Sequence, residues 1–390
     1  MVKVKSWLFT EVRGKVKKAE FRRRKNKVTE LSQKRIPFNP RTEAQQKVRK
    51  AYGQCVEEWN KLSESEKRQW RIIGTLQGIS GYNAFMRECI SKKIGAVWYE
   101  ITIDNSANSN DLTDYQVLLE IVNDSTFFED CQNEQKYLEF YDTDKSTLLN
   151  HFVEEFDVTN KNAKIWIKVP SIPANSTKTI YLKINTSRTE DLSNPENVFD
   201  FYDDFEAYNV GDFPSDKWTQ GNAGWKIDQE DTNKIFAKKG SENSAWARTN
   251  NKIQLNAFAV ECKLKHLDTG YLTEIITHLP DGADGGDEGY MYVIGYNGEL
   301  RIHKQGSLVA SKSFSAQANI WYKVRVIFNN GEIKLQVLEP DSDELTYSDA
   351  SPLSQGYAGV RTGGSYTGAV DNYLVRKYTE PEPTVSYAKA

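Results

Sequence analysis

Short segments in which apolar and polar residues alternate dominate this chain after about residue 95. Alternation of this kind gives a strand one buried face and one exposed face, so it predicts antiparallel sheets packed face to face. The first such segments cover residues 98–103, 117–121, 164–169 and 177–184, with clusters of turn-forming residues between them. We therefore assign residues 95–188 to a β-sandwich.

A second set of alternating segments follows a polar linker at residues 189–197. The clearest of its strands lie at residues 258–265, 288–296, 300–305, 321–328, 332–339 and 369–378. The sequence Asn329-Asn330-Gly331 between two of them is a strong signal for a tight hairpin. About ten strands over residues 198–380 predict a two-sheet jelly roll. We expect residues 381–390 to be a peripheral strap or a flexible end.

Residues 41–94 have a helical pattern instead. Thr42 and Ser63 each precede a Gln or Glu by three residues, which is the capping-box pattern of a helix start. Apolar residues then recur at helical spacing around Trp59 and Phe85, which predicts three short amphipathic helices with their aromatic residues in a small core. The expected fold class is therefore mainly β: two tandem β-sandwiches preceded by a basic arm and a small α-helical segment.

Charge is divided unevenly along the chain. Residues 1–93 hold 24 Lys and Arg against 9 Asp and Glu, whereas the rest of the chain holds 27 against 45. The most basic stretch, Arg22, Arg23, Arg24 and Lys25, lies in residues 1–40, which we predict to be an extended arm. Clustered cations suit an acidic protein surface in an assembly or the phosphates of a nucleic acid. We rank the assembly contact first.

Two classes of targeting segment are not expected. No run of ~18 apolar residues occurs, so the sequence predicts no membrane insertion. The N-terminal segment lacks the apolar core of a signal peptide, which disfavours simple secretion. The cysteines are scattered without a CxxC pair, and we predict four free, buried thiols: Cys55, Cys89, Cys131 and Cys262.

The first sandwich resembles a known family. Residues 99–117 read YEITIDNSANSNDLTDYQV, residues 138–157 read LEFYDTDKSTLLNHFVEEFD, and residues 163–184 read AKIWIKVPSIPANSTKTIYLKI. These segments resemble a family of domains of unknown function that is frequent in surface proteins of archaea and bacteria and in some of their viruses. The family's usual Tyr-Gly-Asn after the last strand is replaced here by Lys-Ile-Asn at residues 183–185. The resemblance implies a β-sandwich and no assigned chemistry.

The second sandwich resembles concanavalin-like (LamG-type) jelly rolls. The carrying segments are FDFYDDFEAYNVGDFPSDKW at residues 199–218, WYKV at residues 321–324 and GVRTGGSYTGAVDNYLV at residues 359–375. The resemblance implies a binding or structural module of a kind that sometimes belongs to glycan-active enzymes.

The helical segment is similar to short domains encoded in phage and prophage genomes. NPRTEAQQKVR at residues 39–49, WNKLSESEKRQW at residues 59–70 and SGYNAF at residues 80–85 carry this similarity. The second of these segments is also similar to one helix of an HMG box, which bends DNA. The order of the remaining elements does not fit that fold.

Carboxylates at the ends of the jelly roll are candidate metal ligands. Asp204 and Glu206 lie at its first strand and Asp371 on its last, and these strands are often neighbours in such folds. Hard oxygen ligands of this kind suit a structural Ca²⁺ ion, although a solvated, hydrogen-bonded edge gives the same pattern. The acidic loop at residues 280–290 does not have the spacing of an EF-hand, so we favour a solvated loop there.

Aromatic residues of the jelly roll are candidate sugar-binding residues. Trp218, Trp225, Tyr290 and Tyr292 are the candidates whose ring faces could stack on pyranose rings; core packing is the alternative. No nucleophile elbow, P-loop, HExxH motif or paired catalytic carboxylate pattern is present, so no enzyme is expected, with a glycan-active enzyme as the minor alternative.

These features together predict a non-enzymatic structural protein of a virion. The arm and helices would anchor it to copies of itself and to other virion proteins, and the sandwiches would face outward as a capsid or tail decoration, spike or fibre that touches host glycans. A cell-surface adhesin or envelope protein that binds carbohydrate is the alternative location and function. A DNA-linked role of residues 1–93 is a further alternative.

Overall fold

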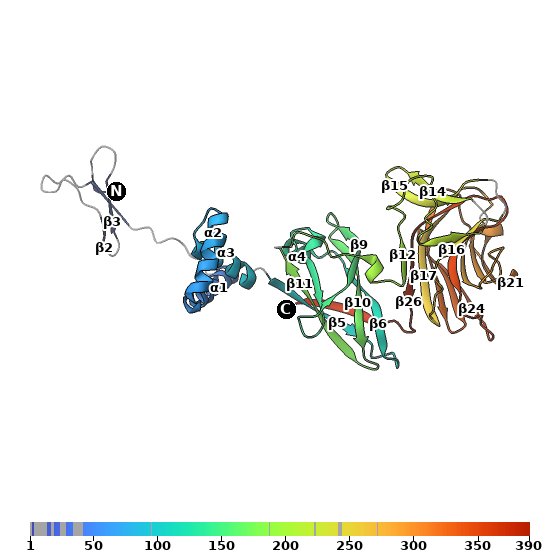
Figure 1. Cartoon of the computed structure of the whole chain (residues 1–390), viewed down its shortest axis with the longest axis horizontal. Coiled ribbons are helices and arrows are strands. Elements are labelled where there is room, and N and C mark those ends of the chain that lie inside the picture. The colour runs from blue at the N-terminus through green and yellow to red at the C-terminus, as the bar shows by residue number, and fades with distance from the viewer. Residues whose placement is uncertain are drawn as a thin grey trace. The chain divides into compact units, whose positions relative to one another are not determined.

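The computed structural model describes residues 2–3, 14–16, 19–23, 29–33, 42–94, 96–186, 188–221, 224–240, 244–270 and 272–390. The chain forms two compact units, residues 1–94 and residues 95–390 (Figure 1). The described part contains no helix that is both long and apolar enough to cross a membrane.

The first unit begins with short strands where the sequence predicts an extended arm. They are β1 (Val2–Lys3), β2 (Gly14–Val16), β3 (Ala19–Arg23) and β4 (Thr29–Gln33). They form an antiparallel sheet in the order β1-β4-β3-β2. The register places Phe21 opposite Leu31 and Arg22 opposite Glu30. Such strands are stabilised by neighbours on the opposite strand. A periodic pattern within one segment does not show these neighbours, so the sequence did not predict the sheet.

Three helices follow, as the capping signals predict: α1 (Glu43–Lys61), α2 (Glu64–Leu76) and α3 (Gly81–Ile94). Ser63 and Glu66 form the expected capping box. Phe85 and Met86 form the core with the sulfur atoms of Cys55 and Cys89.

A disulfide joins Cys55 in α1 to Cys89 in α3. The prediction of four free thiols is therefore wrong for these two residues. It fails because the packing of α1 on α3 brings together positions 34 residues apart. Cys131 and Cys262 are free and buried, as predicted.

The first sandwich of the second unit packs a three-stranded sheet on a five-stranded sheet (Figure 1). Its elements are β5 (Ala96–Asp104), β6 (Leu112–Ile121), α4 (Ser125–Asp130), β7 (Leu138–Tyr141), β8 (Leu148–Leu149), β9 (His151–Asp157), β10 (Asn162–Ile172) and β11 (Thr177–Asn185), with β27 (Thr384–Lys389) from the end of the chain. The sheet orders are β6-β10-β9 and β27-β5-β11-β7-β8. The buried side chains between the sheets are those of the expected alternation, including Ile101, Ile103, Ile165 and Leu182.

The C-terminal segment returns to this first sandwich. Strand β27 pairs antiparallel with β5 in a register from Thr384–Asp104 to Lys389–Tyr99. The Tyr387 hydroxyl donates to Asp124 at 2.9 Å. The segment expected to be a strap or a flexible end is thus an edge strand of a domain whose first strand, β5, begins at Ala96.

The jelly roll fills the chain between β11 and β27. Its strands are β12 (Phe201–Asp203), β13 (Trp218–Gln220), β14 (Trp225–Glu230), β15 (Asn233–Lys238), β16 (Trp246–Thr249), β17 (Ala257–His266), β18 (Thr273–Leu279), β19 (Tyr290–Ile294), β20 (Glu299–Lys304), β21 (Ser307–Ser313), β22 (Trp321–Asn329), β23 (Glu332–Glu339), β24 (Asp343–Ser348), β25 (Tyr357–Thr362) and β26 (Gly368–Lys377). One sheet has the order β14-β15-β26-β17-β22-β23-β24, with β12 on β26, and the other has the order β13-β16-β25-β18-β19-β20-β21.

The predicted hairpin is present between β22 and β23. Asn329 pairs with Glu332, and Asn330 and Gly331 both have positive φ, at 51° and 98°. This is the backbone that the Asn-Gly sequence favours. The fold is mainly β with two tandem sandwiches, which confirms the predicted fold class.

The two sandwiches meet at a contact that we call the seam, formed around Trp166, Phe199, Arg376 and Glu382. Arg376 is 1% exposed; its Nε lies 2.7 Å from Glu261 Oε1 and its Nη1 lies 2.6 Å from Glu382 Oε1. The guanidinium also lies over the Trp166 ring, 5.1 Å from its centroid. A cleft of about 290 Å³ beside the seam is lined by ion-paired side chains, among them Glu154 and Lys323 at 2.8 Å.

Candidate functional site

The four aromatic residues that the sequence suggests for sugar binding lie in the core of the jelly roll. Trp218, Trp225, Tyr290 and Tyr292 are at most 1% exposed. Their polar atoms are satisfied internally; the Trp218 indole, for example, donates to Asp203 at 2.7 Å. This prediction needs correction, because none of these rings can present a face to a ligand. These residues occupy the strand positions whose side chains point into the core, so core packing was the better interpretation of the alternating pattern.

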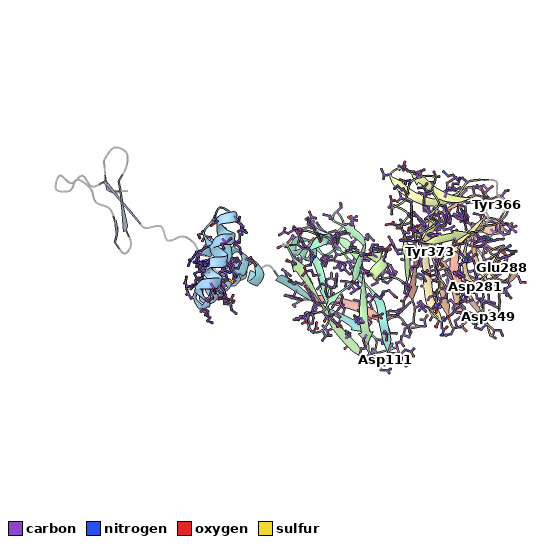
Figure 2. The ribbon with its side chains drawn as sticks, viewed as in Figure 1. Asp111, Asp281, Glu288, Asp349, Tyr366 and Tyr373 are labelled. Carbon is purple, nitrogen blue, oxygen red and sulfur yellow. A yellow bond between two sulfur atoms is a disulfide. The ribbon has the colours of Figure 1, made fainter. Side chains whose placement is uncertain are left out.

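The acidic loop at residues 280–290 covers the outer side of the seven-stranded sheet of the jelly roll. The Trp246 indole donates to the backbone carbonyl of Asp284 at 3.0 Å, and Arg361 Nε donates to that of Gly285 at 3.0 Å. Arg361 also pairs with Glu274 at 2.5 Å. Figure 2 shows Glu288 of this loop, whose Oε1 accepts from the backbone N–H groups of residues 284 and 285. The Glu288 carboxylate thus stabilises the backbone of its own loop.

The proposed calcium ligands are engaged in local hydrogen bonds. Strands β12 and β26 are neighbours as expected. Asp204 Oδ1 accepts from the backbone of Glu206 at 3.2 Å, and Glu206 Oε1 accepts from the backbone of Lys234 at 2.8 Å. Asp371 accepts from the Asn233 amide at 3.2 Å. In the part of the chain that the structure describes, no three His, Cys, Asp or Glu side chains are grouped to hold a metal ion.

The basic cluster of the arm is only partly described. Arg22 and Arg23 lie in β3, with no description of their side chains. Arg24 and Lys25 lie outside the described residues.

Three aromatic side chains that the sequence interpretation did not select share the outer side of the five-stranded sheet. Trp98 lies on β5, Tyr181 on β11 and Tyr141 on β7, which are adjacent strands. The Trp98 ring centroid lies 5.7 Å from that of Tyr141 and 6.4 Å from that of Tyr181, with interplanar angles of 49° and 82°. All three side chains are partly exposed. We call this group the aromatic face.

A signal for the aromatic face is present in the sequence. Tyr99 and Ile101 are buried, so Trp98 has the outward parity of its polar neighbour Glu100. Tyr181 likewise alternates with the buried Ile180 and Leu182. An aromatic residue at the polar parity of a strand is therefore the pattern to search for.

A network of polar groups borders the aromatic face at Glu139. This side chain is 2% exposed and accepts from the Tyr141 hydroxyl at 2.9 Å, the Asn185 amide at 2.8 Å and Arg188 Nε at 2.8 Å. Lys183 Nζ lies 3.4 Å away. Burial acts to raise the pKa of Glu139, but these hydrogen bonds and cations outweigh it and lower the pKa. The carboxylate therefore stays charged and holds its partners in place.

Lys145 lies above the aromatic face. Its Nζ is 3.9 Å from the centroid of the Tyr181 ring and 5.7 Å from that of Trp98. It belongs to the turn between β7 and β8, where its N–H donates to the carbonyl of Asp142 at 2.9 Å. The Asp142 carboxylate is itself paired with Lys178 at 2.8 Å. The aromatic face thus combines inclined ring surfaces with an exposed lysine ammonium.

Comparison with known proteins gives a family match for part of the chain. The sequence profile of the family named "Domain of unknown function (DUF2341)" matches residues 134–221. This span contains Tyr141, Lys145 and Tyr181 and ends inside the jelly roll. A jelly-roll sandwich therefore follows a domain of unknown function, as the sequence resemblances imply. No curated protein matches the chain.

Solved structures of three proteins are similar to part of the chain. The carbohydrate-binding module CBM66 from Bacillus subtilis is 14% identical, covers 41% of this chain and 96% of its own, and has a TM-score of 0.33. A protein of unknown function with a galectin-like fold from Bacillus subtilis is 13% identical over 45% and 98%, with a TM-score of 0.35. The exoplasmic/lumenal domain of VIP36 bound to Ca²⁺ and Man3GlcNAc is 10% identical over 44% and 95%, with a TM-score of 0.33. These similarities assign no ligand to this chain.

Proposed function

We propose that this protein is a non-enzymatic, glycan-binding structural protein whose sugar site is the aromatic face of the first sandwich. The observation that carries the proposal is the partial exposure of Trp98, Tyr141 and Tyr181 on the solvent-facing side of a sheet. Ring faces in such a position offer apolar surface to the CH groups of pyranose rings. Because the rings are inclined to one another, they suit single units of a soluble sugar chain better than a flat crystalline polysaccharide.

The border of the aromatic face supports the same function. Tyr141, Lys183 and Arg188 present hydroxyl, ammonium and guanidinium groups beside the rings and are held by the buried Glu139. A few fixed polar groups next to apolar surface are the usual composition of a small-ligand site, since the polar groups determine orientation.

In this role the sandwiches lie on the outside of a virion, and residues 1–94 are anchored to copies of the chain and to other virion proteins. Two features of the first unit support an anchoring role. Its helices expose large apolar side chains: Val48, Tyr52, Ile72 and Leu76. Its disulfide suits an oxidising environment, such as a particle surface. A cell-surface adhesin would use the same sugar site, and we propose no catalytic role.

Binding of the full-length chain to a printed glycan array tests the sugar site. We expect retention of a defined set of glycans, and a loss of at least about tenfold in affinity for Trp98→Ala and Tyr181→Ala, since each removes a stacking ring. Tyr366→Ala is the matched control, because Tyr366 is 38% exposed on the jelly roll. Unchanged glycan binding in both aromatic-face variants would refute the assignment, and a loss confined to Tyr366→Ala would move the site to the jelly roll.

Size-exclusion chromatography with light scattering tests the assembly. We expect the nuclease-treated full-length chain to form a salt-stable oligomer. A monomer at both low and high salt would contradict the structural role without affecting the sugar site.

A further inference from the structure

We infer that the glycan bound at the aromatic face is acidic, with a sugar carboxylate or sulfate paired to Lys145; this inference rests on the proposed function. The first observation is the position of Lys145. Its ammonium lies over Tyr181 and near Trp98, and among the described residues no carboxylate pairs with it. A cation held at ring faces without a counter-charge is an available partner for an anion.

The second observation is the charge balance around the rings. Glu139 is only 2% exposed and is already shared by Arg188 and Lys183, and Asp142 is held by Lys178. Glu100 and Asp104 are exposed carboxylates at the outward parity of β5, and Glu100 lies opposite Tyr181 in the register. Two cations thus share the buried carboxylate of Glu139, and the neighbouring Asp144 carboxylate accepts hydrogen bonds within its own turn. Among the described residues, no ion pair joins Lys145 to a carboxylate.

The third observation is the turn that presents Lys145. Asp144 Oδ1 accepts from the N–H groups of Ser146 and Thr147, both at 2.8 Å, and the N–H of Asp142 donates to the Thr147 carbonyl at 2.9 Å. These bonds fix the backbone, whereas the Lys145 side chain is exposed and no hydrogen bond is described for its ammonium. When a sugar ring stacks on Tyr181, the ammonium can move to the rim of that ring and remain within reach of an acidic substituent.

Stacking rings beside lysines also occur in single-strand nucleic acid sites. The aromatic face favours a glycan, because the exposed carboxylate of Glu100 lies opposite Tyr181 in the register and would repel a backbone with a charge at every unit. An acidic sugar within a partly neutral chain places one charge beside Lys145 and leaves its other units uncharged.

The test uses the full-length chain and an array of matched glycans in which the same backbone is printed in neutral, uronic or sialylated, and sulfated forms. A single-stranded oligonucleotide serves as a further probe. Lys145→Met keeps the aliphatic stem and removes the charge. Lys136→Met is the matched control, because Lys136 lies 5.4 Å from the centroid of the Tyr137 ring in the same sandwich.

We expect the acidic form to bind more tightly than its neutral partner, and Lys145→Met to reduce that preference on the order of fivefold, as for an exposed ion pair. Lys136→Met should leave it unchanged. The carboxylated and sulfated forms distinguish the two sources of charge. Equal binding of neutral and acidic glycans, or an oligonucleotide as the only Lys145-dependent ligand, would overturn the inference. Retention of no glycan at all would refute the proposed function as well.

Discussion

Replacement of Arg376 by methionine tests whether the seam makes the two sandwiches one cooperative unit. The guanidinium is 1% exposed and holds two carboxylates, those of Glu261 and Glu382. Removal of one partner from a buried ion pair typically destabilises a protein by about 3–5 kcal/mol. Here Glu261 keeps Arg325 at 2.9 Å, and Glu382, whose side chain is 32% exposed, can be hydrated. We therefore expect the lower end, about 3 kcal/mol.

Urea denaturation followed by tryptophan fluorescence measures this change. Lys323→Met is the matched control, because its partly exposed pair with Glu154 crosses the same seam and is expected to contribute at most about 1 kcal/mol. We expect Arg376→Met to separate the transition into two steps. A single transition with a free energy of unfolding within about 1 kcal/mol of the wild-type value would refute the reasoning, since removal of one partner from a buried ion pair should destabilise the protein by more than that.

The pH dependence provides a second measurement of the same interaction. Burial acts to raise the pKa of Glu261, but the charges of Arg376 and Arg325 outweigh it and lower the pKa to about 2. A carboxyl with a depressed pKa in the folded state contributes stability above its unfolded pKa and loses it as the pH falls through the folded value. The difference between wild type and Arg376→Met should therefore be constant near neutral pH and shrink between about pH 4 and pH 2.

Two further predictions concern Asp371 and β27. Burial raises the pKa of Asp371 to about 6, so its contribution to stability declines as the pH rises through 6; Asp371→Asn should be more stable than wild type by about 1–2 kcal/mol at pH 8 and not at pH 4. Calorimetry at both pH values measures this, and stabilisation of the wild type by added Ca²⁺ would contradict it. Deletion of residues 384–390 should lower the melting temperature and cause aggregation through the freed edge of β5; a monomeric, equally stable variant would show that the edge is not protected by this strand.

Local signals predicted the elements of this fold well. The capping box at Ser63 and the turn at Asn330 and Gly331 each depend on residues within a few positions of one another, and both are present. The partners of distant segments could not be predicted in this way. The disulfide depends on helix packing, and the pairing of β27 with β5 depends on where the jelly roll returns the chain.

For the candidate site, too, local sequence patterns predict some features and the pairing of distant strands determines the others. An aromatic residue in a strand indicates a pleated, half-buried position without showing which side it faces. Trp218 and Tyr290 lie at inward positions, whereas Trp98 and Tyr181 lie at outward ones. Parity within each strand separates these groups, but only the sheet order brings Trp98 and Tyr181 together on adjacent strands.

The course of the chain shows that the first of the two tandem sandwiches is completed by a strand that follows the jelly roll. The first sandwich consists of residues 96–185 together with β27, so the chain crosses the seam twice, and the second crossing carries Glu382 to Arg376. Two crossings restrict rotation between domains far more than one flexible linker does. The DUF2341 match covers neither β5 nor β27 and therefore does not delimit a folding unit. Trp98 lies on β5, and β27 pairs with β5 at the edge of the sheet. The strand that carries Trp98 is therefore paired on both sides only when β27 has joined the sheet.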